Sequence, residues 1–299
     1  MSHKLKEFLN NNKMNISKHF IFSRNIQIVC VTLCILLIFI SCDETPKTII
    51  KTETVTTPES TVAEIPYSVL NTSPHDVSSF TEGFLFHNGQ LFESTGATAE
   101  LPQTKSLFGI VDVKTGKIDA KVELDKTVYF GEGIVVLKNK MYQITYKNQV
   151  GFIYDAVTYK KIGQFNYANK EGWGLTTDGT SIIMSDGSNM LTYFNPDGMT
   201  VTKTLSVSNN GYAEDYLNEL EYINGFIYAN VWLKNYLVKI NPTDGKIVGI
   251  IDLSAIEGKE KMTNVSAKEM NGIAFDSATN KILVTGKMWA NIYQIGFAH

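Results

Sequence analysis

Short apolar runs alternate with polar turns along most of this chain. From about Ile65 onward, runs rich in Val, Ile, Leu, Phe and Tyr are separated by clusters of Gly, Asn, Asp and Thr, and no long stretch has a helical period. This pattern is typical of β-strands joined by tight turns. We therefore predict an all-β domain over residues 65–299.

One unit of the pattern recurs, a polar turn followed by a strand, as in Asn88-Gly89-Gln90-Leu91-Phe92. Five such strands carry apolar anchors spaced by 50, 41, 44 and 56 residues, namely Leu91, Met141, Ile182, Phe226 and Ile282. A repeat of this length with several strands per unit indicates a five-bladed β-propeller. The last unit is short of strands, so we expect Tyr67–Leu70, from the N-terminal end, to close the last blade. A β-sandwich, the alternative fold, does not repeat at this interval.

The N-terminal segment has the pattern of an export signal. Five basic residues precede the apolar run Ile28–Ile40, which is short for a membrane span, because spanning takes about 20 residues. The run ends at Ser41-Cys42, which resembles the bacterial lipoprotein box, in which the Cys is lipidated. We predict a signal peptide over residues 1–41, lipidation of Cys42, a flexible tether over residues 42–64, and export to the bacterial cell envelope. An uncleaved signal anchor is the alternative.

Cysteine content and charge limit the partners of the domain. All three cysteines (Cys30, Cys34 and Cys42) lie in the N-terminal segment, so the domain has no disulfide and depends on its core for stability. Removing residues 1–41 takes away five basic residues and one acidic residue and leaves a net charge of −7. Because no basic tract remains, we expect no nucleic-acid partner.

A short motif with a polar or aromatic side chain precedes each anchor strand and leads into the inner strand of its repeat. The motifs are Phe80-Thr81-Glu82-Gly83, Phe130-Gly131-Glu132-Gly133, Glu171-Gly172-Trp173-Gly174, Leu217-Asn218-Glu219-Leu220-Glu221 and Asn271-Gly272-Ile273-Ala274. The inner strands of a propeller converge on one mouth of its central channel, so residues at matching positions are expected to meet there. Repeated structural turns are the alternative, but they do not explain why these residues differ in chemical type.

Glu132 is the first candidate for chemistry. It lies between two glycines, after Tyr129 and Phe130 and before the apolar run that starts at Ile134. Dry surroundings raise the pKa of a carboxyl group and make it a better proton carrier near neutral pH. A turn glutamate between two strands is the plainer alternative.

Two tryptophans and a lysine add to the candidates. Trp173 and Trp232 are two of the three tryptophans, although a tryptophan in a blade is more often part of the core than of a pocket. Lys287 lies in the apolar strand Ile282–Trp289, where an unpaired ammonium is costly to bury. We therefore expect Lys287 to face a carboxylate or a wet channel.

In their order along the chain, these pieces resemble the plant and bacterial glutaminyl cyclases, the five-bladed glutaminyl-peptide cyclotransferases of the papaya-latex type. The resemblance rests on the first four motifs, on Leu91-Phe92-Glu93-Ser94-Thr95-Gly96 and on Leu283-Val284-Thr285-Gly286-Lys287-Met288-Trp289. It implies an acyltransferase that converts the N-terminal glutamine of peptides or proteins to pyroglutamate and releases ammonia. No metal or other cofactor is implied.

The resemblance also assigns site residues. It places the catalytic carboxylate on Glu132 and substrate binding on Phe80, Glu82, Tyr146, Trp173, Asn218, Trp232 and Lys287. The family usually has Gln where Glu82 stands and Trp where Tyr146 stands. Both differences bear on substrate preference more than on reaction type.

Four other assignments compete with this one. The zinc-dependent type of glutaminyl cyclase and a Ser-His-Asp hydrolase fit poorly, because only His75, His87 and His299 follow the signal and they lack ligand spacing. A calcium-dependent propeller lactonase would draw oxygen ligands from Glu82, Glu132, Asn218 and Glu219. A propeller that only binds a partner is the last alternative, since propellers have many functions.

Overall fold

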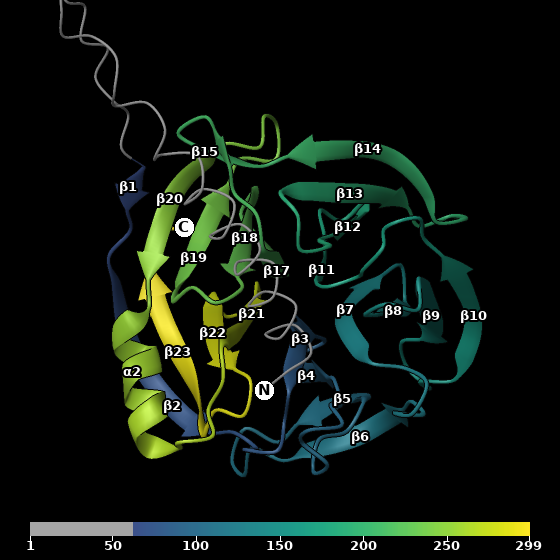
Figure 1. Cartoon of the computed structure of the whole chain (residues 1–299), viewed down its shortest axis with the longest axis horizontal. Helices are drawn as coiled ribbons and strands as arrows, with labels where there is room; N and C mark the ends of the chain where they lie inside the picture. The colour runs from purple at the N-terminus through teal and green to yellow at the C-terminus, as the bar shows by residue number, and fades with distance from the viewer. Residues whose placement is uncertain (1–61) are drawn as a thin grey trace, which may run out of the picture. The chain divides into compact units, whose positions relative to one another are not determined.

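The computed structural model describes residues 62–299, which form a five-bladed β-propeller (Figure 1). The predicted fold class is therefore confirmed. The predicted signal peptide, Cys42 and residues 42–61 of the predicted tether lie outside the described residues. Within residues 62–299, no helix has the length and apolar character needed to cross a membrane.

The first four blades each contain four consecutive antiparallel strands. Blade one has β3 (Thr81–His87), β4 (Gln90–Thr95), β5 (Leu107–Val111) and β6 (Ile118–Glu123), and blade two has β7 (Gly131–Leu137), β8 (Lys140–Thr145), β9 (Val150–Asp155) and β10 (Lys161–Asn166). Blade three has β11 (Leu175–Thr177), β12 (Ile182–Met184), β13 (Met190–Asn195) and β14 (Thr200–Ser206), and blade four has β17 (Leu217–Ile223), β18 (Phe226–Val231), β19 (Tyr236–Ile240) and β20 (Ile247–Asp252).

Blade five joins the two ends of the described chain. It contains β21 (Met270–Asp276), β22 (Lys281–Gly286), β23 (Asn291–Phe297) and β2 (Tyr67–Pro74), and β2 pairs antiparallel with β23. A two-residue strand, β1 (Ala63–Glu64), pairs in parallel with β20, so the last residues of the predicted tether belong to a sheet. The connections before and after blade four carry the short strands β15 (Ser208–Asn209) and β16 (Tyr212–Ala213) and the helix α2 (Ser254–Thr263).

The apolar anchors all lie in the second strand of their blades. The innermost strands are β3, β7, β11, β17 and β21, which contact one another around the centre. Four of the predicted motifs are therefore part of the innermost strands, whereas only the motif of blade three ends before its strand begins. The ladder register shifts at this point in those four blades, and such β-bulges redirect side chains.

The turns between the first two strands of each blade have the backbone that their residues predict. Asn88 and Gly89 connect β3 and β4 with φ of 49° and 73°, and Asn224 and Gly225 connect β17 and β18 with φ of 47° and 89°. Asn and Gly adopt this left-handed region with little strain, so they favour two-residue hairpins.

Five apolar clusters fill the spaces between neighbouring blades. In the cluster between blades one and two, for example, Phe92 and Phe108 pack with Met141 and Phe152. Corresponding clusters join blades two and three, three and four, and four and five. The fifth cluster packs Phe84 of blade one with residues of blade five and closes the ring. Because each sheet is buried on both faces, the innermost strands are held rigidly around the centre.

Candidate active site at the hub of the propeller

Five residues at matching positions of the five blades meet where the innermost strands converge. We call them the hub ring; they are Glu82, Glu132, Trp173, Asn218 and Asn271. All five are buried. Glycine follows the ring residue in four blades, and Glu219 takes that place in blade four.

The glycines allow neighbouring ring residues to approach closely. A Cβ added to Gly83 would lie 3.1 Å from the Cα of Gly133, and one added to Gly174 would lie 2.2 Å from the carbonyl oxygen of Asn218. The N–H of Gly133 donates to the carbonyl oxygen of Trp173 at 2.8 Å. Blades one to four are thus linked through the backbone of the hub ring.

Polar side chains from blade one and blade two hold the backbone of Glu132. Ser94 Oγ donates to the carbonyl oxygen of Glu132 at 2.6 Å, and Gln143 Nε2 donates to Ser94 Oγ at 3.2 Å. Ser106 Oγ accepts a hydrogen bond from the N–H of Gly131 at 2.6 Å. Sequence reasoning missed these supporting residues, although Ser94 lies in one of the matched pieces.

The carboxylate of Glu132 lies in a dry environment near Tyr167. Glu132 is 0% exposed. Burial raises the pKa of Tyr167 to about 12, and the negative charge of Glu132 adds to that rise. The Tyr167 hydroxyl donates to the carbonyl oxygen of Thr145, so it supports the wall between blades two and three.

The ammonium of Lys287 is paired with Glu82. Its Nζ lies 2.8 Å from Glu82 Oε1, and the two side chains are 1% and 0% exposed. The same Nζ lies 4.7 Å from the centroid of the Phe80 ring, which adds a cation–π contact. Asn271 Nδ2 donates to the second oxygen, Glu82 Oε2, at 3.1 Å. Glu82 adds a negative charge where the family usually has glutamine, and the ammonium of Lys287 neutralises that charge within the hub.

Aromatic side chains form two groups at the hub. In the first, Phe130 contacts Phe80 and Tyr146, with ring centroids 6.1 Å and 5.8 Å apart. In the second, Trp232 contacts Trp173 and Tyr216, with both centroid distances 5.8 Å. Phe130 and Tyr216 were not among the predicted binding residues, although Phe130 lies in the motif of Glu132.

A charged pair links the partly exposed ends of two predicted binding residues. Lys147 Nζ lies 4.7 Å from the centroid of the Tyr146 ring and 3.5 Å from Glu171 Oε1. The other oxygen, Glu171 Oε2, accepts a hydrogen bond from the Trp173 indole at 2.8 Å. These contacts fix the orientation of the Trp173 indole relative to Tyr146.

Glu219 connects blade four to blades one and five beyond the hub ring. Its carboxylate accepts hydrogen bonds from the N–H of Phe84 at 3.2 Å and from the N–H of Ile273 at 2.8 Å. Burial and the nearby Glu221 raise its pKa well above the usual value. Because Glu219 binds N–H donors and Glu82 binds an ammonium, two of the oxygen ligands expected for a calcium ion are already engaged by positive partners.

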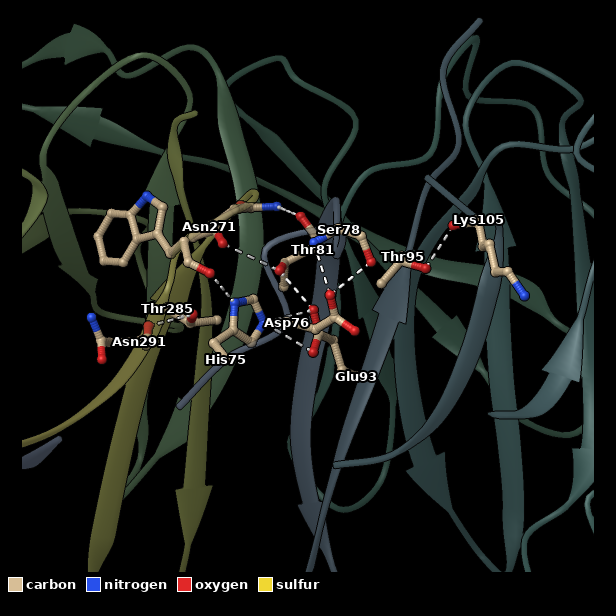
Figure 2. A network of polar contacts seen from close by, with 12 residues as sticks. His75, Asp76, Ser78, Thr81, Glu93, Thr95, Lys105, Asn271, Thr285 and Asn291 are labelled. Carbon is tan, nitrogen blue, oxygen red and sulfur yellow. Dashed lines mark hydrogen bonds and ion pairs between the residues drawn. The ribbon is translucent and has the colours of Figure 1, made fainter. Parts of the chain in front are cut away.

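A buried network extends from the hub to the first residues after β2 (Figure 2). His75 Nδ1 lies 2.9 Å from the carbonyl oxygen of Trp289, and His75 Nε2 lies 3.1 Å from both oxygens of Glu93. Since both partners only accept hydrogen bonds, the imidazole is a double donor and carries a positive charge. Thr81 Oγ1 donates to Glu93 Oε1 at 2.7 Å, and the carbonyl oxygen of Thr81 accepts from Asn271.

The structure brings residues from all five blades together at the hub, in the two groups described above and the hub ring. Asn230, Asn271, Ser94 and the pair His75–Glu93 were not among the predicted site residues. Matching repeat position was the signal for Asn271. A separate cavity of about 470 Å³ lies at the outer edge of blade four, beside β1 and β20, and none of the predicted site residues line it.

Comparisons with known proteins agree on one family. The model of the glutamine cyclotransferase family matches residues 41–297. A glutaminyl-peptide cyclotransferase of Arabidopsis thaliana is 41% identical over 224 residues, which is 74% of this chain and 68% of the relative. The crystal structure of Myxococcus xanthus glutaminyl cyclase superposes with a TM-score of 0.72 at 29% identity and covers 79% of this chain and 98% of its own.

Proposed function

Because the chain belongs to the glutamine cyclotransferase family, we infer that it is a glutaminyl-peptide cyclotransferase. It converts an N-terminal glutamine to pyroglutamate and releases ammonia. The propeller fold and the structural match to a glutaminyl cyclase support the same activity. The observation that carries the assignment of the site is the hub ring, which combines a buried carboxylate with tryptophan and carboxamide side chains.

The reaction is an intramolecular acyl transfer. The α-amine nitrogen of glutamine attacks its own side-chain carbonyl carbon, a tetrahedral intermediate forms, and the C–N bond to the amide nitrogen breaks. The attacking amine must lose a proton, and the leaving nitrogen must gain one to depart as ammonia. The chemistry therefore needs a proton carrier, a donor for the oxyanion and a surface that holds the substrate folded.

We assign the proton transfer to Glu132. One carboxylate is enough, because the proton taken from the α-amine is the proton that the leaving nitrogen needs. Burial of Glu132 keeps bulk water away from the reacting atoms. The bond from Ser94 Oγ to the carbonyl oxygen of Glu132 fixes the backbone that carries the carboxylate.

We assign stabilisation of the oxyanion to Lys287 or the side-chain amide of Asn218. We assign to the aromatic side chains the task of holding the glutamine side chain folded toward its own amine. Lys287 is a cation held in place by Glu82 and Phe80, so it offers charge without reorganisation. Trp173, Trp232 and Tyr146 restrict the flexible glutamine side chain, and a held geometry lowers the barrier.

We propose that these steps need no metal ion and that the enzyme is of the papaya-latex type. Glu132 is assigned the proton transfer, and Lys287 or Asn218 is assigned the negative charge of the oxyanion, so each step has a side chain of this chain that can perform it. The alternative lactonase depends on a central calcium ion, so it predicts that a chelator abolishes activity on a lactone. Unchanged ammonia release from a glutamine peptide in the presence of chelator supports the metal-free proposal.

The test of the site is Glu132→Gln. General acid–base groups contribute about 10²- to 10⁴-fold to rate, so we expect ammonia release from a Gln-initiated peptide to fall by that factor while the fold is kept. Glu123→Gln is the matched control, because Glu123 is exposed and pairs with Lys105 at the surface. Near-normal turnover in Glu132→Gln contradicts the assignment. No ammonia release by the unaltered protein contradicts the activity itself and favours a propeller that only binds.

We also propose that the protein is exported and anchored to the cell envelope through lipidated Cys42. The support is the sequence alone, with its apolar run followed by Ser41-Cys42. Incorporation of labelled fatty acid in the native protein and its loss in Cys42→Ser test the proposal. Membrane attachment without label indicates an uncleaved signal anchor instead.

A further inference from the structure

The side-chain amide of Asn271 has a fixed orientation. Its Nδ2 donates to the carbonyl oxygen of Thr81 at 2.9 Å and to Glu82 Oε2 at 3.1 Å, and both of these partners only accept. The Oδ1 atom must therefore point away from them. It is buried and has no hydrogen-bond partner among residues 62–299.

The side-chain amide of Asn230, at the end of β18, is fixed in the opposite sense. Its Oδ1 accepts from the N–H of Gly272 at 2.9 Å, and a backbone N–H only donates. Its Nδ2 therefore faces elsewhere, and this buried donor also lacks a partner in the described part of the chain.

The two amides are linked through the backbone of β21 at the junction of blades four and five. Asn230 is bonded to the N–H of Gly272, which directly follows Asn271 in the hub ring. A buried donor or acceptor without a partner costs about 1–3 kcal/mol, so leaving one of each at the same place requires a reason. A ligand group with one acceptor and one N–H donor satisfies both.

We propose that Asn230 and Asn271 recognise the side-chain carboxamide of the substrate's N-terminal glutamine, a role that rests on the function proposed above. The substrate C=O accepts from Asn230 Nδ2 in addition to the oxyanion donor assigned above, and the substrate NH₂ donates to Asn271 Oδ1. The leaving nitrogen is thereby placed in the hub ring that also contains Glu132. Because a glutamate carboxylate has no N–H, it would set a negative oxygen against Asn271 Oδ1.

Asn230 and Asn271 together determine specificity for glutamine, and the binding of two matched peptides tests this role. One peptide begins with glutamine, and the other begins with norleucine, which has a similar length and no amide. Asn230→Asp keeps an acceptor for the Gly272 N–H but replaces the free donor with an oxygen. We expect the preference for the glutamine peptide over the norleucine peptide to fall by about 10- to 100-fold, with the inhibition constant of the norleucine peptide unchanged.

A matched control and the wild-type reaction separate the possible failures. Asn195→Asp makes the same change in an exposed turn where Oδ1 accepts from the N–H of Asp197. It should leave unchanged both the preference for the glutamine peptide and the inhibition constant of the norleucine peptide. Equal weakening of both peptides in Asn230→Asp indicates structural damage and overturns the proposal. Wild-type ammonia release with an unchanged preference in Asn230→Asp overturns this inference alone, whereas no wild-type release overturns the proposed function.

A second measurement does not depend on the folding of Asn230→Asp. We expect a crystal structure of Glu132→Gln with the glutamine peptide bound to show the substrate amide nitrogen within about 3.2 Å of Asn271 Oδ1 and its oxygen within that distance of Asn230 Nδ2. Ordered water bonded to both asparagines, with the peptide amide elsewhere, overturns the proposal.

Discussion

Replacing Lys287 with methionine removes the ammonium that neutralises Glu82 in the hub. The side chains of this pair are 1% and 0% exposed, so Glu82 cannot exchange its lost partner for bulk water. Among residues 62–299, it keeps the hydrogen bond from Asn271. Breaking a buried ion pair by removing one partner costs about 3–5 kcal/mol, because a charge is left buried and uncompensated. We expect Lys287→Met to lose that much free energy of unfolding.

The same loss is expected in thermal unfolding. For a domain of about 150–250 residues, each kcal/mol corresponds to about 2–4 °C in Tm, so Lys287→Met should unfold about 6–20 °C lower than the wild type. The double variant Glu82→Gln/Lys287→Met has no unpaired charge. We expect it to lie within about 1–2 kcal/mol of the wild type, because a buried ion pair contributes little net stability relative to neutral groups of similar size.

Urea unfolding followed by fluorescence measures both differences, and ammonia release separates stability from catalysis. If Lys287 stabilises the oxyanion, the double variant is stable but remains slow on a glutamine peptide. A loss below about 1 kcal/mol in Lys287→Met, or a double variant no more stable than the single one, refutes the reasoning that the hub keeps this pair out of water.

Three further outcomes follow from buried charges and close contacts. Burial alone lowers the pKa of His75, but the charge and hydrogen bonds of Glu93 and its other partners raise it overall, so stability should fall as pH rises from about 6.5 through the folded-state pKa, as urea unfolding at several pH values will measure. Burial raises the pKa of Glu221 to about 8, so the folded protein holds this proton more tightly than the unfolded chain does. The free energy of unfolding should therefore fall by a few kcal/mol, at about 1.4 kcal/mol per pKa unit, as the pH rises from about 4.5 to 8. Glu221→Gln should unfold at a higher urea concentration than the wild type at pH 8. A Cβ on Gly187 would lie 2.5 Å from the Trp173 ring, so Gly187→Ala should raise KM for a glutamine peptide several-fold in steady-state assays of ammonia release.

Two of these outcomes have a matched control, and the third has a result that would contradict it. Glu93→Gln should flatten the pH dependence that His75 causes, and an unchanged slope would show that another group is responsible. A wild-type stability that stays level between pH 4.5 and 8 would contradict the shift at Glu221. Gly198 has φ of +97° with open space around it, so Gly198→Ala carries the backbone strain without the contact to Trp173 and should leave KM unchanged.

The number of blades and the hub ring could be predicted because both repeat along the chain. Turns such as Asn88-Gly89 determine where hairpins form, and the anchor after each turn is buried in the second strand. Two details depended on pairing geometry instead. The motifs were expected ahead of the inner strands, but β-bulges incorporate four of them into those strands. The parallel pairing of Ala63 and Glu64 with β20 has no periodic signal, because two residues are too few to show one.

Contacts between residues far apart in the sequence could not be assigned from the sequence, because only closure of the ring brings these residues together. Lys287 and Glu82 are 205 residues apart, so the expectation of a carboxylate beside Lys287 could not say which one. The repeat does offer a rule once the ring is known: residues at matching positions share the hub, so a departure at one position signals a different task. Glu219 stands where the other blades have glycine, and its carboxylate bonds the backbone of blades one and five, so its task is to join blades. Asn271 keeps the matching position, and its buried Oδ1 has no hydrogen-bond partner among residues 62–299, which is the observation behind the binding role that we propose for it.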